Sequence, residues 1–214
     1  MIISSLFALF FTVLILALGM DFAKKIGARL LLLRGDYDFK NDILKPACIT
    51  GIIVSAIVII INMIMPLTDP IYSFFPVEST QQFILRMLSN LFSVISYNIS
   101  FLLVWVCGLG LLIRSIFKNT PTNTIMYISI VMMAFLRHLL SMLIRFMSIA
   151  ILYIEPQMQI ASTPIVSIDP IIRFGIDVVL GILFWKKGFE TAVLCHLIIV
   201  FIVQMATLVM HFLH

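Results

Sequence analysis

Runs of mostly apolar residues, each about as long as a membrane-spanning helix, recur along this chain. Residues 2–20 and 46–65 contain no charged side chain, and the second run reads PACITGIIVSAIVIIINMIM. In lipid, a backbone must satisfy its own hydrogen bonds, so even a run rich in β-branched residues predicts a helix. We therefore expect an all-α fold, a polytopic transmembrane helix bundle.

Six spanning helices are predicted, in a single integral-membrane domain that covers residues 1–214. The predicted spans are 2–20, 46–65, 91–113, 124–154, 170–185 and 191–213. Residues 79–90 are predicted to form a separate amphipathic surface helix. The chain is 62% hydrophobic and 11% charged, whereas a soluble domain carries about 25% charged residues. The lipid bilayer is therefore the expected solvent.

Basic residues gather in alternate predicted loops. The loops after the first, third and fifth spans hold, in order, six Lys or Arg within 24–45, Arg114 with Lys118, and Lys186 with Lys187. The positive-inside rule then places these loops in the cytoplasm and both termini outside. The basic residues are too few, and too mixed with Asp, to predict a nucleic-acid surface.

Two predicted spans carry charged or ionisable residues at membrane depth, where charge is costly and usually marks a structural pair or a functional site. The fourth span holds Arg137, His138 and Arg145, and the fifth holds Arg173 and Asp177. Arg173 and Asp177 are four residues apart, so they share a helix face and can form an ion pair. Arg137 and Arg145 need an acidic or carbonyl partner, and Asp177 is the best candidate. Together the arginines and Asp177 predict an interior polar network, with an anion site as the alternative interpretation.

The sixth span carries His196, whose simplest interpretation is a hydrogen bond to a neighbouring helix. Cys48, Cys107 and Cys195 lie in apolar segments without the spacing of a zinc ligand pair or a disulfide framework. We interpret them as small buried hydrophobic residues.

Residues 181–196 read GILFWKKGFETAVLCH. This segment resembles the late motif of the CAAX-protease and bacteriocin-processing (abortive-infection-like) family of intramembrane proteases. In that motif a helix ends in a basic glycine turn, and the next helix carries a Glu near its start followed by a His. Residues 137–152, RHLLSMLIRFMSIAIL, resemble the family's glutamate-bearing helix more weakly. The resemblance implies a prokaryotic plasma-membrane protein.

The departures from the family pattern bear on function. At the positions of the family's paired glutamates this chain has Arg137 and His138. At the position of the Asn or Asp that follows the family's last histidine it has Val200. His196 and Glu190 agree with the family motif. Hydrolysis needs a carboxylate base or metal ligands arranged around water. We therefore predict a pseudoenzyme that keeps the fold without the protease chemistry and binds a peptide, a lipid or a partner membrane protein in its polar interior.

Two alternatives stay open. One is an active, divergent, metal-dependent intramembrane endopeptidase that uses Asp177 together with the catalytic residues His138, Glu190 and His196. In that case His138 and His196 would hold zinc, whose ligands lie about 2.0–2.2 Å from the metal. The other alternative is a small transporter or an immunity-type membrane protein.

Overall fold

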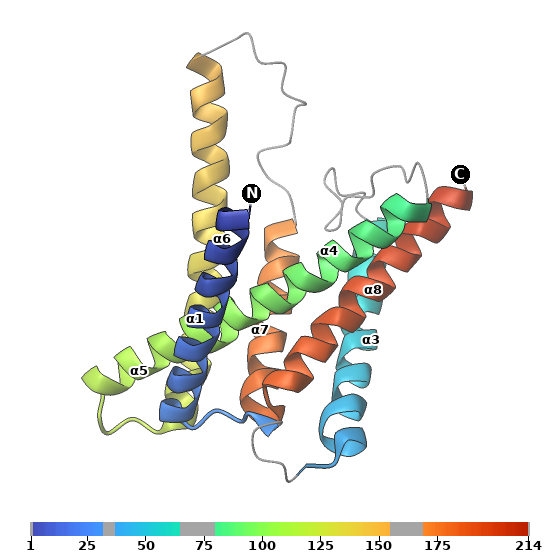
Figure 1. The fold of residues 1–214 in the computed structure, drawn as a ribbon. Helices are drawn as coiled ribbons and strands as arrows, with labels where there is room; N and C mark the ends of the chain where they lie inside the picture. The colour runs from blue at the N-terminus through green and yellow to red at the C-terminus, as the bar shows by residue number, and fades with distance from the viewer. Residues whose placement is uncertain (1, 32–36, 65–79, 155–168, 214) are drawn as a thin grey trace.

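The computed structural model describes residues 2–31, 37–64, 80–154 and 169–213, and all regular structure within them is helical (Figure 1). The all-α prediction is confirmed. In chain order the elements are α1 (Ile2–Ile26), η1 (Phe39–Leu44), α3 (Lys45–Ile64), α4 (Thr80–Asn98), η2 (Ile99–Val106), α5 (Cys107–Ile116), α6 (Thr122–Ile154), α7 (Asp169–Lys187) and α8 (Phe189–Leu213). The elements η1 and η2 are π-helical.

Four stretches of helix are long and apolar enough to cross a membrane. They are Phe39–Ile61, Ser89–Ile116, Thr122–Ile144 and Phe189–Ala206. They coincide with the second, third, fourth and sixth predicted spans. The first and fifth predicted spans fall on α1 and α7, and the full count of six stays a prediction.

The helices α4, η2 and α5 follow one another without a break and form one long rod that crosses the bundle obliquely (Figure 1). The separate surface helix predicted over 79–90 is therefore wrong, because α4 begins at Thr80 and continues directly into the third span. Polar residues early in α4 suggest a surface helix, but no glycine or proline interrupts the backbone before η2. Insertions of π-helix inside α-helices are rare and often adjoin functional sites.

Three basic connections meet at one end of the bundle, while α1 begins and α8 ends at the other (Figure 1). The Arg29 side chain donates to the carbonyl of Lys186 at 3.1 Å, and the Phe189 amide donates to the carbonyl of Arg29 at 3.2 Å. The Trp185 indole donates to Asn123 at the start of α6, at 3.1 Å. These bonds tie the segment after α1 and the start of α6 to the α7–α8 turn.

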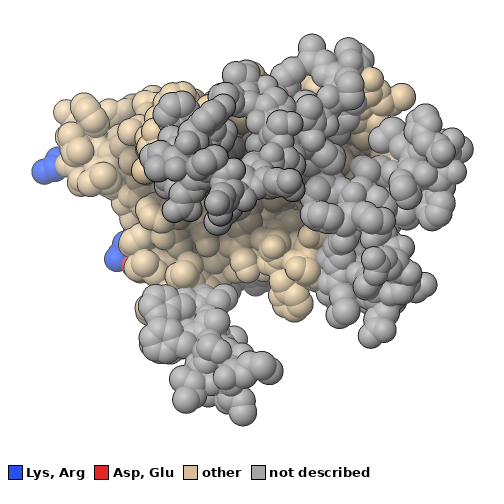
Figure 2. Space-filling model, turned by 90° about the horizontal axis from the view of Figure 1, so that it is seen from above, with Lys and Arg blue, Asp and Glu red and all other residues tan. Residues whose placement is uncertain are grey.

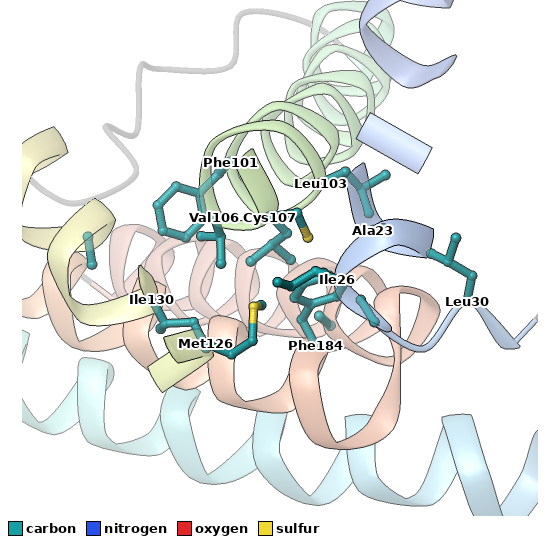
Figure 3. Close-up of a cluster of buried hydrophobic side chains, with 14 residues drawn as sticks. Ala23, Ile26, Leu30, Phe101, Leu103, Val106, Cys107, Met126, Ile130 and Phe184 are labelled. Atoms are coloured by element: carbon teal, nitrogen blue, oxygen red, sulfur yellow. The ribbon is translucent and has the colours of Figure 1, made fainter. Parts of the chain in front are cut away.

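Apolar side chains from α1, η2, α5, α6 and α7 form the larger core cluster (Figure 3). Val106, Met126 and Phe184 are fully buried within it. Close contact of α6 with α7 depends on Gly181, because an added Cβ would overlap the Cγ2 methyl of Ile130. A second cluster, between α3, α7 and α8, includes Ala47, Ile176, Leu180, Cys195 and Ile199.

The outer surface of the described residues is largely apolar. Viewed from above, the described surface shows charged side chains only at one edge (Figure 2). Large apolar side chains such as Ile52, Ile57, Leu140 and Ile144 are more than half exposed. An exposed apolar surface of this extent is rare in soluble monomers and suits contact with lipid.

Candidate functional site

A cavity of about 340 Å³ lies between α4, α6, α7 and α8. Its polar wall consists of Ser93, Tyr97, Arg137, Arg173, Asp177 and His196. Four helices thus bring ionisable groups together within an otherwise apolar bundle. Such groups inside a membrane protein usually face the bundle interior and mark a structural pair or a functional site.

Asp177 lies at the centre of this polar group and is 3% exposed. One carboxylate oxygen, Oδ1, accepts a hydrogen bond from the Tyr97 hydroxyl at 2.5 Å. The other, Oδ2, accepts from Nη1 of Arg137 at 2.5 Å and contacts Nε2 of His138 at 2.9 Å. Because an ionised carboxylate only accepts, the His138 contact places a proton on Nε2. The predicted pairing of Arg137 with Asp177 is confirmed.

Arg137 also contacts Tyr97 directly. Its Nη1 donates to the Tyr97 hydroxyl, and its Cζ atom lies 4.2 Å from the centroid of the Tyr97 ring. A guanidinium group over an aromatic face gains electrostatic attraction from the ring quadrupole. Asp177, Arg137, His138 and Tyr97 therefore form one connected network across α4, α6 and α7.

His196 on α8 belongs to a second, adjacent hydrogen-bonded group. The side-chain amide of Asn98 donates to the carbonyl of Val94 at 2.7 Å and contacts Nδ1 of His196 at 3.0 Å. The Val94 carbonyl fixes which end of the amide carries the hydrogens, so Nδ1 of His196 accepts and Nε2 carries the proton. The His196 and Tyr97 rings are nearly perpendicular, with centroids 5.4 Å apart. The predicted hydrogen bond from His196 to a neighbouring helix is confirmed.

Asn98 is fully buried, and its Oδ1 atom has no hydrogen-bond partner among the residues that the structure describes. Sequence reasoning missed both Tyr97 and Asn98. The signal was a pair of adjacent polar residues within the apolar run 91–113. Polar side chains in a spanning helix usually bond across to another helix, which both residues do here.

The remaining predicted site residues have different positions. Arg173 lines the cavity one turn before Asp177, and their predicted ion pair stays a prediction. The side chain of Arg145 lies outside the described part of the structure. Glu190 lies at the α7–α8 turn, where its Oε2 atom accepts from the Leu31 amide at 3.1 Å. It is not among the residues that line the cavity.

Across the described ranges, no group of three His, Cys, Asp or Glu side chains lies close enough to hold a metal ion. His138 contacts Asp177, and His196 contacts Asn98. The described residues therefore do not assemble the zinc site that the endopeptidase alternative requires.

Comparison with protein-family models, with curated proteins and with solved structures finds no match to this chain.

Proposed function

We propose that this chain is a non-catalytic, multi-pass membrane protein that binds a ligand in the cavity between α4, α6, α7 and α8. The main support is the position of Asp177, the one carboxylate among the residues that line this cavity. A general base needs a lone pair within about 2.6–3.2 Å of the proton it removes. Both oxygens of Asp177 already accept hydrogen bonds, one of them from the guanidinium of Arg137. This arrangement suits an anchor between helices.

Four long apolar helices support a multi-pass arrangement, and we infer that α1 and α7 supply two further spans. In α7, Ile176 and Asp177 are buried against neighbouring helices. A helix with charged residues in its middle is tolerated in a membrane when those residues face protein.

The three basic connections share one end of the bundle (Figure 1), and we infer that this end is cytoplasmic. Labelling with a membrane-impermeant maleimide tests this orientation. Cys107 and Cys195 are fully buried and stay in place, while the partly exposed Cys48 is replaced. A Lys118→Cys variant should react only after the cells are permeabilised, and a cysteine appended at the C-terminus should react in intact cells. The reverse pattern would overturn the orientation.

The proposal is consistent with the resemblance to the CAAX-protease family, because such a chain would share the family's fold without its catalytic residues. Gly188, in the basic turn of the motif, has a φ of +110°, which side-chain-bearing residues rarely adopt. The backbone conformation of the turn therefore explains why the motif has a glycine at this position. The positions that correspond to the family's glutamates carry Arg137 and His138, which both bind Asp177.

A cleavage assay on the purified protein tests the loss of catalysis. We expect no hydrolysis of hydrophobic reporter peptides above the blank, with or without added zinc, and no difference between the parent protein and a His196→Ala variant. Turnover that His196→Ala abolishes, or zinc bound at one equivalent per chain, would overturn the proposal.

A further inference from the structure

A second cavity, of about 370 Å³, lies between α6 and the rod formed by α4 and η2. Tyr97 and Arg137 line both this cavity and the polar one. The rest of its wall consists of Ser100, Phe101, Trp105, Met133, Leu136 and Leu140. Trp105 and Leu140 are 59% and 57% exposed, so this lateral cavity is open toward the lipid-facing side of the helices.

Arg137 carries hydrogen-bond donors that its neighbours do not use. Its Nη1 atom makes the bonds to Asp177 and to the Tyr97 hydroxyl, and Nε and Nη2 have no acceptor among the residues that the structure describes. The side chain is 39% exposed. Within the described part of the chain, the only enclosed side-chain atom without a partner is Oδ1 of Asn98. The donors on Nε and Nη2 are therefore accessible.

The guanidinium group of Arg137 is held from two sides. Its Cζ atom lies 4.2 Å from the centroid of the Tyr97 ring and 6.0 Å from that of Phe101, and these two rings stack with centroids 5.5 Å apart. Nη1 is bound to Asp177 at the same time. Groups that are oriented in advance lose little freedom when a ligand binds. The Nε–Nη2 edge is therefore ready to bind an oxygen acceptor.

The depth of Arg137 in the membrane limits what this acceptor can be. The residue lies seven positions before the end of the apolar stretch Thr122–Ile144, which is about 10 Å at 1.5 Å per residue. Its distance from the start of the stretch is about 22 Å on the same scale. A charged head group would have to leave the interface by at least the shorter distance, and charge at this depth is costly. The charge of Arg137 is already matched by Asp177, so an uncharged acceptor suffices.

We propose that the lateral cavity binds a fatty acyl ester without a charged head group. The ester carbonyl accepts hydrogen bonds from the Nε–Nη2 edge of Arg137, and the hydrocarbon chain lies against Trp105 and Leu140. An acyl chain brings no backbone amides that need partners in lipid, whereas a peptide does. This inference goes beyond the proposed function, because it concerns a site that is open to the bilayer and does not depend on the ligand of the polar cavity.

Fluorescence quenching by brominated lipids tests the proposal, because bromine quenches tryptophan only at short range. Trp105 and Trp185 are the two tryptophans of the chain, and Trp185 lies outside the lateral cavity, bonded to Asn123. A full-length Trp185→Phe variant therefore reports on the cavity, and a Trp105→Phe variant is the control. Methyl dibromostearate should quench Trp105 saturably in detergent, and Trp185 without saturation. Saturable quenching of equal strength at both positions would overturn the proposal.

The role of the carbonyl is tested with dibromooctadecane, which has the same chain without the ester. Its half-quenching concentration should be about tenfold higher, a difference of about 1.4 kcal/mol. Equal potency of ester and hydrocarbon would overturn the role of Arg137. The free acid, dibromostearate, tests the charge of the ligand at alkaline pH. Tighter binding of this carboxylate than of its methyl ester would overturn the assignment of an uncharged ligand.

Arg137→Lys, made in the Trp185→Phe protein, keeps the positive charge beside Asp177 but removes the guanidinium edge. It should weaken ester binding about tenfold and leave hydrocarbon binding unchanged, a difference that a merely structural role would not produce. Arg114→Lys makes the same change at an exposed position in the last turn of α5 and should affect neither ligand. Equal effects of the two variants on ester binding would contradict the proposal.

A second pair of variants keeps the test decisive if Arg137→Lys does not fold. Ser100→Phe narrows the lateral cavity without touching the Arg137–Asp177 pair, so it should weaken both the ester and the hydrocarbon. Ser115→Phe adds the same side chain at an exposed position near the end of α5 and should weaken neither. Unchanged ester binding in the Ser100→Phe variant would place the ligand elsewhere and overturn the proposal.

Discussion

Replacing Asp177 with Asn removes the negative charge that joins Arg137 to α7. The Asp177 side chain is 4% exposed and that of Arg137 is 39% exposed. Two unit charges about 4 Å apart interact by about 4 kcal/mol at an effective dielectric constant of 20. Because more than a third of Arg137 is exposed, solvent screening reduces this to about 2 kcal/mol. For a chain of this length, each kcal/mol shifts the thermal midpoint by about 2–4 °C, so Asp177→Asn should lower it by about 4–8 °C.

Thermal unfolding in detergent, followed by tryptophan fluorescence, measures the shift. Asp21→Asn is the matched control, since it removes a carboxylate from an exposed ion pair with Lys25 at 2.6 Å. Exposed pairs contribute about 0.2–1 kcal/mol, so its midpoint should fall much less. Combining Asp177→Asn with Arg137→Gln should cost less than the sum of the two single changes. Equal destabilisation by the two Asp→Asn variants would refute the central role of the network.

Three further predictions concern the supports around the site. Gly181→Ala should destabilise the folded protein by about 1–3 kcal/mol, because the added Cβ overlaps Ile130. In the same helix, a Cβ added at Gly175 meets nothing within 4 Å. Gly175→Ala should therefore be neutral or slightly stabilising in the same thermal assay. Asp38 caps η1. Hydrogen bonds from the side chain and the backbone amide of Asn41 lower the pKa of its carboxyl group. A folded pKa below the unfolded one means that the cap stabilises the fold at neutral pH and loses this effect as the pH falls through the folded pKa. Amide-exchange protection of the first turn of η1 should therefore decrease in acid, and Asp38→Asn should abolish that dependence. Finally, Glu190→Ala should lower the thermal midpoint while Glu190→Gln, which keeps the oxygen acceptor, should remain close to the parent protein.

The helices could be predicted where an apolar run ends at a clear boundary. The predicted span 46–65 corresponds to α3 (Lys45–Ile64), and 124–154 corresponds to α6 (Thr122–Ile154). Lipid imposes both the helical backbone and the minimum length, so composition alone determines these elements. The continuous rod of α4, η2 and α5 could not be predicted, because a π-helical insertion depends on tertiary packing more than on local preference.

The site could be predicted only in part. Charges inside lipid must find partners, which made Arg137 and Asp177 a natural pair across two helices. The need for a partner is weaker for neutral polar residues such as Tyr97 and Asn98. Sequence spacing within one helix also does not show which neighbouring helix these residues face. The role of Glu190 was equally hidden, because its partner is a backbone amide in the segment after α1.

The distribution of charge distinguishes the two main functional hypotheses on physical grounds. A metal-dependent hydrolase concentrates carboxylates and neutral histidines around a cation. Here two arginines line the cavity, and the carboxylate of Asp177 is already bound to one of them. A divalent cation entering this space would meet these two guanidinium groups, and like charges repel. Arg137 and His138 both bind the Asp177 carboxylate, so this carboxylate is better suited to anchor α6 to α7 than to act as a general base or a metal ligand.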